Sequence, residues 1–281
     1  MHALTITPSI PFRIPAQPLA ITLVGCGGTG SHLAQTLARL ARHVRESGGL
    51  LDLTFIDGDT VEPKNVGRQL FAPSEVGRNK AQVLATRFSA VFGLPISAVP
   101  QMADRVQQFD HHRDALRYRI AVGAVDGAAG RSVMELALAL SHIDLWLDCG
   151  NHEHDGQVVL GTAPHAQDLA GAFAIDGMCA GLPAPSLQLP ALLTARPPAP
   201  RRDCAQAVAD NAQAFQINTV IAQVAGQYLA QLALARQVSH FATWISLTGM
   251  VMRSTPITAA NVAEATCIPL ADLITQKRRA A

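Results

Sequence analysis

The stretch Ile21-Thr22-Leu23-Val24-Gly25-Cys26-Gly27-Gly28-Thr29-Gly30-Ser31 decides the fold. Its first four residues predict a short buried strand, and the residues after its glycines carry an apolar stripe at helical spacing, formed by Leu33, Leu37, Leu40 and Val44. Small residues between a strand and a helix let the backbone approach a phosphate at the helix amino terminus. A tight turn without a ligand would need the same glycines, so this turn alone does not identify a function.

Strand and helix patterns alternate along the chain that follows. Strands are expected at 50–56, 120–125 and 145–149, and helices at 79–92 and 131–140. This alternation predicts an α/β fold: a Rossmann-like, doubly wound, mostly parallel sheet with helices on both faces. Ligands of such sheets bind at the carboxyl ends of the strands.

The remaining segments complete a single expected domain over 1–281. Residues 1–19 form an N-terminal arm, and residues 163–210 are rich in proline and predict a long crossover loop. Residues 211–281 predict a helix and then a strand pair at 241–247 and 250–253, a C-terminal antiparallel extension.

Composition excludes several classes of protein. The chain has 22 Lys+Arg against 21 Asp+Glu and only the basic run Lys277-Arg278-Arg279, which argues against a nucleic-acid platform. The longest apolar stretch, 136–147, is too short to span a bilayer, and no secretory signal is recognisable, so no membrane partner and a cytoplasmic location are expected. Five cysteines without a CxxC pair indicate a reducing compartment and no structural zinc.

An acidic and polar block follows the second strand, Asp57-Gly58-Asp59-Thr60-Val61-Glu62-Pro63-Lys64-Asn65-Val66-Gly67-Arg68-Gln69-Leu70-Phe71. Asp57 at the tip of a strand is placed to accept hydrogen bonds from ribose hydroxyls. Asn65, Arg68 and Lys80 supply donors of the kind that a triphosphate needs. A solvated charged loop could explain any one of these residues, but it explains their joint arrangement poorly.

A further carboxylate, Asp126, ends the strand pattern at 120–125 and precedes Arg131. Carboxylates and phosphate oxygens together hold Mg²⁺ in proteins. An aspartate at this place is equally suited to cap the next helix. Asp126 is therefore a candidate metal ligand or an N-cap.

Taken together, the glycine run, the block 57–71, Gly77-Arg78-Asn79-Lys80 and the Asp126 and Arg131 pair resemble the adenylation domain of the ThiF/MoeB/ubiquitin-activating superfamily. The match covers 21–131 well and the rest loosely. The resemblance implies that ATP binds with Asp57 at the ribose, with Asn65, Arg68 and Lys80 at the phosphates, and with Mg²⁺ on Asp126. The full set of candidate nucleotide-binding residues is Gly25, Gly27, Gly28, Gly30, Ser31, Asp57, Asp59, Asn65, Arg68, Gln69 and Lys80.

The implied reaction is ATP-dependent adenylation of the C-terminal carboxylate of a small ubiquitin-like or sulfur-carrier protein, with release of pyrophosphate. Arg68, Lys80 and Mg²⁺ on Asp126 would stabilise the charge that develops. Within the superfamily, the chain is most similar to the ThiF-type member of the PRTRC gene clusters. This similarity lies in the loop at 42–51, in the sequence of 65–71 and in Phe215-Gln216-Ile217-Asn218. Members of the superfamily form homodimers that borrow an arginine from the partner's N-terminus, for which Arg13 is the candidate here.

Transfer of the activated carboxylate to a cysteine occurs in some relatives, and Cys179 and Cys204 are the candidates. Cys204 follows Arg201-Arg202, and positive charge activates a thiol. An inert loop thiol is the simpler interpretation of each, and Cys26 is interpreted as a space-filler within the glycine run. The run His152-Glu153-His154 is interpreted as a polar, solvent-facing loop.

Two other functions fit part of the pattern. A nicotinamide-dependent oxidoreductase rests on the glycine turn alone and leaves Arg68-Gln69 and Lys80 without a role. A catalytically inactive scaffold that binds nucleotide or a ubiquitin-like partner would keep the same polar residues.

Overall fold

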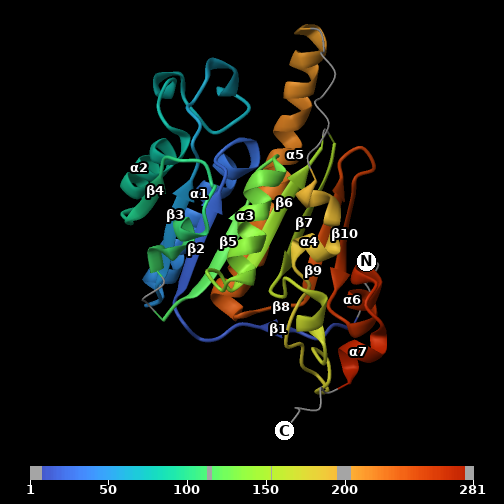
Figure 1. Ribbon diagram of the computed structural model, residues 1–281. Coiled ribbons are helices and arrows are strands. Elements are labelled where there is room, and N and C mark those ends of the chain that lie inside the picture. Colours follow the sequence, from blue (N-terminus) through green and yellow to red (C-terminus); the bar gives the residue numbers. More distant parts are fainter. Residues whose placement is uncertain (1–7, 113–115, 153, 195–203, 276–281) are drawn as a thin grey trace, which may run out of the picture.

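One eight-stranded sheet organises the protein, in the order β10-β9-β7-β6-β5-β2-β3-β4 (Figure 1). The computed structural model describes residues 8–112, 116–152, 154–194 and 204–275, with the backbone alone for 111–112 and 204–215. The strands are β1 Phe12–Arg13, β2 Leu19–Val24, β3 Leu51–Ile56, β4 Ile96–Val99, β5 Tyr118–Gly123, β6 Leu145–Asn151, β7 Asp155–Gly161, β8 Gln237–Val238, β9 His240–Ser246 and β10 Val251–Pro256.

Helices occupy several of the connections between these strands. The α-helices are α1 Gly28–Glu46, α2 Lys80–Phe92, α3 Ala128–Ala139, α4 Pro185–Gln188, α5 Cys204–Ala230, α6 Ala259–Thr266 and α7 Leu270–Ile274. Short 3₁₀ helices span Pro63–Asn65, Pro73–Glu75, Val106–His112, Ala166–Leu169 and Pro190–Leu193, and a π-helical turn at Gln231–Ala235 extends α5.

The parallel half of the sheet creates the place for a ligand. β2 pairs with β3 on one side and with β5 on the other, so that Val24 lies beside both Ile56 and Gly123. All six residues of β2 are buried, as expected for a strand covered on both faces. The chain leaves β2 toward β3 and β4 and then returns to β5 on the opposite side. The topological switch point therefore lies between β2 and β5, outside whose carboxyl ends ligands of such sheets bind.

Helices α1 and α5 pack side by side on one face of the sheet. A Cβ atom on Gly28 would meet Asn218, and one on Gly226 would meet Thr36. Both helices advance by eight residues between these contacts, so they run parallel. Helix α5 therefore extends beyond the amino terminus of α1, and Figure 1 shows its first turns rising above the sheet. Helix α3 covers the opposite face, where Met134 and Trp146 share a buried cluster.

The fold class is confirmed, including the mostly parallel sheet and the antiparallel strands toward the C-terminus, but several boundaries differ from the sequence predictions. Helix α1 continues to Glu46, which leaves only 47–50 of the loop expected at 42–51. Helix α5 begins at Cys204 rather than after 210. The described part of the Pro-rich segment contains short helices, and the backbone N–H of Ala163 donates to the carbonyl of Leu182. Proline ends long helices but permits such single turns.

Two strands of the eight-stranded sheet, β7 and β4, were missing from the sequence prediction, as was the short β1-β8 pair. β7 begins with Asp155 and Gly156, residue types typical of turns, yet it pairs antiparallel with β6 and β9 in the interior of the sheet. β4 has four residues and lies at the edge, where a short strand has no clear alternation. Tertiary pairing supplied what the local pattern lacked.

The N-terminal arm is attached at the end of the sheet opposite the carboxyl ends of the parallel strands. β1 pairs antiparallel with β8, which places Phe12 opposite Val238. In Figure 1 this pair lies at the end of the molecule where β2 begins. Residues 1–7 and the basic run at 277–279 lie outside the described residues. Within the described part of the chain, we find no helix that combines the length and the apolar character needed to cross a membrane.

Candidate functional site

The glycine turn between β2 and α1 is closely packed on one side and open on the other. Gly25 has φ +90°, and a Cβ there would lie 2.4 Å from the carbonyl oxygen of Ala124. A Cβ on Gly30 would lie 1.9 Å from the carbonyl oxygen of Gly25. These two glycines are required by the turn itself. Gly27 differs, because a Cβ there would meet only the Nε2 atom of Gln69, at 3.9 Å. The turn therefore leaves room beside Gly27 for a ligand.

Asp57, at the carboxyl end of β3, is hydrogen-bonded to this turn. Its Oδ2 atom accepts from the backbone N–H of Cys26 at 2.6 Å, and its Oδ1 atom accepts from the backbone N–H of Asp59 at 2.8 Å. Burial raises the pKa of Asp57, while these two N–H groups and Lys80 act in the opposite direction. A carboxylate offers about four lone-pair positions, so two positions remain available for hydroxyl donors.

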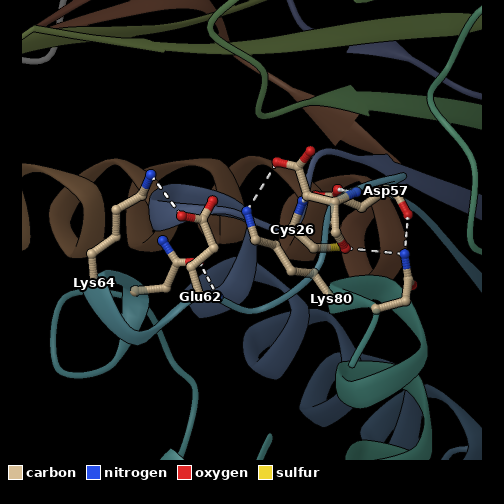
Figure 2. Close-up of polar contacts among 8 residues, drawn as sticks. Cys26, Asp57, Glu62, Lys64 and Lys80 are labelled. Atoms are coloured by element: carbon tan, nitrogen blue, oxygen red, sulfur yellow. Dashed lines mark hydrogen bonds and ion pairs between the residues drawn. The ribbon is translucent and has the colours of Figure 1, made fainter. Parts of the chain in front are cut away.

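A buried cation lies next to Asp57, as Figure 2 shows. The Nζ atom of Lys80 is 3.0 Å from Oδ2 of Asp59, and the Lys80 side chain is 7% exposed against 52% for Asp59. Asn79 holds this arrangement, because its Nδ2 atom donates to the backbone carbonyls of both Asp57 and Asp59. Its Oδ1 atom also caps α2 by accepting from the backbone N–H of Gln82 at 3.0 Å. The sequence therefore positions one lysine at the start of α2 with little freedom to move.

Ser31 joins the glycine turn to the polar block. Its hydroxyl donates to the carbonyl of Gly28 at 3.1 Å and accepts from the backbone N–H of Leu70 at 3.0 Å. Asn65 is also buried, and its Oδ1 atom accepts from the backbone N–H of Glu62 at 2.9 Å. Ser31 thus holds the block against the turn, and Asn65 stabilises the backbone within the block.

Gln69 and Arg68 differ in their surroundings. Gln69 is buried, and its Oε1 atom has no hydrogen-bond partner among the described residues. A buried amide oxygen without a partner costs free energy, which fits a position completed by a ligand. Arg68 is only partly buried, and its Nε atom donates to the carbonyl of Lys64 at 3.3 Å.

Asp126 follows β5 at the same edge of the sheet as the glycine turn, and its carboxylate is exposed. Arg131 on α3 reaches back, so that its Nη1 atom lies 3.4 Å from the main-chain carbonyl of Asp126. The Nε atom of Arg131 donates to Oδ1 of Asp148 on β6 at 3.0 Å. This ion pair is buried, with Arg131 4% exposed and Asp148 fully enclosed. Burial raises the pKa of Asp148 to about 6, and Arg131 opposes that shift.

A cavity of about 750 Å³ opens beside Asp126. It lies between the sheet and the segment 189–194, which contains the 3₁₀ helix Pro190–Leu193, and most of its exposed lining is apolar. Its wall includes Arg131, Leu189, Leu192, Trp244 and Arg253. The volume is within the range of about 300–1,000 Å³ that ligand pockets occupy. Sequence reasoning missed this cavity, since its walls come from segments far apart in the chain.

Asn218, from α5, forms a second polar connection to the glycine turn. Its Oδ1 atom accepts from Oγ1 of Thr29 at 2.9 Å and from Nδ2 of Asn151 at 2.7 Å. The three side chains come from the start of α1, the end of β6 and the middle of α5. The only sequence signal for this group was the resemblance at 215–218.

Neither of the two candidate transfer cysteines has a described side chain at this site. Cys179 is buried, and its backbone pairs with Phe12 of β1, at the far end of the sheet. Burial raises the pKa of the Cys179 thiol to about 12, the opposite of an activated thiol. The side chain of Cys204 and the backbone of Arg201-Arg202 lie outside the described residues. Cys26 is enclosed in the turn, and burial raises its pKa as well.

Two other predicted features have structural positions. Arg13 lies in β1, where its Nε atom donates to Oε1 of Gln237 at 3.1 Å. Its contribution to a partner's site stays a prediction. His152 is exposed at the rim of the cavity, whereas Glu153 lies outside the described residues. No cluster of three or more His, Cys, Asp or Glu side chains suited to a metal occurs in the described ranges.

Comparison with known proteins supports a family assignment. The family model described as "ThiF family" matches residues 17–267. No curated protein sequence matches the chain. Among solved structures, the fold is similar to that of selenomethionine PaaA, with TM-score 0.54, 16% identity and coverage of 85% of this chain and 64% of that one. It is also similar to Escherichia coli MccB with ATP, with TM-score 0.53, 15% identity and coverage of 86% and 64%. The chain thus spans less than two thirds of the length of these proteins, and the likeness shows the fold.

Proposed function

Because the chain belongs to the ThiF family, we propose that it activates a carboxylate by adenylation. ATP binds at the glycine turn, and an oxygen of the substrate carboxylate attacks the α-phosphorus. The bond between the α-phosphorus and the bridging oxygen breaks, and pyrophosphate leaves with the electron pair. The products are an acyl-adenylate and pyrophosphate. The observation that carries this proposal is the hydrogen-bonded assembly of the glycine turn, Asp57, Asp59 and Lys80 at the switch point of the sheet.

The residues present fit a nucleotide. The space beside Gly27 admits a phosphate, and the first turn of α1 has no acidic residue and no side-chain cap. The free lone pairs of Asp57 suit ribose hydroxyls. Lys80 offers a buried positive charge, and Gln69 offers a buried amide without a partner for its oxygen. The nicotinamide alternative assigns no role to that buried lysine.

Different residues would contact the phosphates and hold the metal ion. Lys80, Arg68 and Asn65 lie in or next to the polar block and would contact the phosphate chain. Asp126 is the exposed carboxylate at the end of β5 and would hold Mg²⁺, an ion that takes one or two carboxylates together with phosphate oxygens. Bound Mg²⁺ would supply charge neutralisation at the phosphates. Positioning and charge stabilisation are what phosphoryl and nucleotidyl transfer chiefly require.

The acyl substrate is proposed to be the C-terminal tail of a small ubiquitin-like or sulfur-carrier protein. The cavity beside Asp126 supports this choice, because its apolar walls at Leu192 and Trp244 could take an extended tail whose carboxylate points toward the nucleotide. A transfer of the acyl group to a cysteine could follow on Cys204, whereas Cys179 is buried at the far end of the sheet and is not proposed as the acceptor. A homodimer with Arg13 in the partner's site completes the proposal.

The test is exchange of labelled pyrophosphate into ATP by the purified protein, with and without the ubiquitin-like protein encoded nearest to its gene. Arg68→Ala and Asp126→Ala should each reduce partner-dependent exchange by about 10²-fold or more, because each removes a group facing the developing charge. Arg42→Ala and Glu46→Ala, the two members of an exposed ion pair in the last turns of α1, are matched controls and should exchange normally. Full exchange by both Arg68→Ala and Asp126→Ala would refute the assignment.

A further inference from the structure

The side chain of Asn218 lies directly against the start of α1. It is 5% exposed, and a Cβ atom on Gly28 would lie 2.4 Å from its Nδ2 atom and 2.8 Å from its Cγ atom. Gly28 is the first residue of α1. No side chain larger than hydrogen fits there while Asn218 keeps its place. Because Gly28 has no side chain, the carboxamide of Asn218 can lie against the first turn of the helix.

The orientation of this carboxamide is set by two donors. Oγ1 of Thr29 and Nδ2 of Asn151 both donate to Oδ1 of Asn218, at 2.9 and 2.7 Å. An amide oxygen has two lone pairs, so these contacts use its acceptor capacity fully. The Nδ2 group of Asn218 is then the end of the amide that faces Gly28. Among the described residues, no hydrogen-bond acceptor for that group is present.

A donor in this position suits an anion. The first turn of α1 has no acidic residue, and its cap residue Gly27 contributes no side-chain acceptor. Backbone N–H groups at a helix start, together with the helix dipole, attract phosphate. Next to Gly27, the Nε2 donor of a second buried amide, Gln69, lies 3.9 Å from where a Cβ atom of Gly27 would be. Side-chain amides of Asn218 and Gln69 therefore lie against Gly28 and Gly27 of the same turn.

We propose that Asn218 is a phosphate-binding residue, which donates a hydrogen bond from Nδ2 to a nucleotide phosphate held at the first turn of α1. The inference rests on the proposed function, because it needs a nucleotide at the glycine turn. It extends the site from the first half of the chain to α5, whose preceding turns rise above the sheet (Figure 1). Thr29 and Asn151 act as positioning residues, since they hold the amide and do not themselves touch the ligand.

Calorimetric binding of ATP and of adenosine tests this assignment. Asn218→Ala removes the donor, and Asn218→Asp keeps an acceptor oxygen for Thr29 and Asn151 but replaces the donor with a charge. Both variants should bind ATP about tenfold or more weakly, because a hydrogen bond to a charged group is lost. Adenosine, which has no phosphate, should bind as tightly as to the wild type. Asn261→Asp makes the same chemical change at a distant amide, and it should bind both ligands normally.

The outcomes separate this inference from the proposed function. If the wild type binds ATP and Asn218→Ala binds it equally well, the inference is wrong and the proposed function stands. If affinity for adenosine falls as much as affinity for ATP, Asn218 supports the whole turn rather than a phosphate, and the inference is again wrong. A wild-type protein that binds no nucleotide overturns both. Melting temperatures of all variants show whether a loss of binding reflects unfolding.

Discussion

Replacing Gly28 with alanine gives a quantitative test of the packing at the glycine turn. Gly28 begins α1, and its backbone is not in the left-handed region, so alanine is acceptable to the main chain there. In an open helix position alanine would gain about 0.5–1 kcal/mol over glycine. Here its Cβ would lie 2.4 Å from Nδ2 of Asn218, and overpacking of this kind costs about 1–3 kcal/mol. The net expectation is a loss of about 1–2 kcal/mol in the free energy of unfolding.

The same substitution in an Asn218→Ala background separates the clash from other effects. Asn218→Ala alone should cost about 1–3 kcal/mol, because Thr29 and Asn151 lose their shared acceptor. With the carboxamide gone, Gly28→Ala should be neutral or stabilising by about 0.5–1 kcal/mol. The two positions should therefore show a coupling energy of about 1–3 kcal/mol, as residues in direct contact do.

Urea unfolding of the wild type, the two single variants and the double variant measures this coupling, provided that all four have the same m-value. Gly127→Ala is the control. Gly127 also lies at the start of a helix, as the N-cap of α3, but a Cβ atom there would meet nothing within 4 Å. Equal costs for Gly28→Ala in both backgrounds would show that Asn218 does not occupy the space beside Gly28. The orientation argued for its amide would then fail as well.

Three further predictions follow from the site. Lys80→Met should reduce pyrophosphate exchange by about 10²-fold while changing thermal stability little, since its partner Asp59 is half-exposed; normal exchange would contradict a phosphate role. Asp148 has a pKa raised to about 6, against about 3.9 when unfolded, so the folded state binds the extra proton between these values. Wild-type stability relative to Asp148→Asn should therefore fall by about 2–3 kcal/mol from pH 4 to pH 7 in urea titrations, and a rise would refute the burial argument. Gly30→Ala should cost about 3 kcal/mol or more in thermal unfolding, far more than Gly127→Ala, because its Cβ would lie 1.9 Å from a carbonyl oxygen; similar melting temperatures would contradict that packing.

Much of the parallel half of the fold could be predicted from the chain alone. The apolar run before Gly25 and the helical spacing after it specify β2, the turn and α1, because strand and helix periods are local properties. The same reasoning found β3, β5, β6 and α2 with modest errors at their ends. Strand β7 was not predicted, because it begins with Asp155 and Gly156, residue types typical of turns, and it is defined by its pairing with β6 and β9.

Some residues of the candidate site could likewise be recognised from the sequence, and others could not. Asp57 and Lys80 were recognised because an acid at a strand end and a lysine at a helix start are visible in the spacing of one short block. Asp148 was not recognised, although a carboxylate inside an apolar strand indicates that a cationic or hydrogen-bonding partner must lie beside it. Its partner Arg131 lies on another element, and only the packing of α3 over β6 joins the two.

The sequence by itself determined the strand, turn and helix that open the fold, the carboxyl-end edge at which polar residues gather, and the family to which they point. Those features depend on neighbours within a few residues, where backbone sterics and periodic burial act directly. Only the tertiary structure decided that Asn218 meets Thr29 across 189 residues of chain, and that the wall of the cavity combines Asp126 with Trp244. Contacts of that separation arise when helices and strands bury their apolar faces together, and no local pattern records which faces will meet.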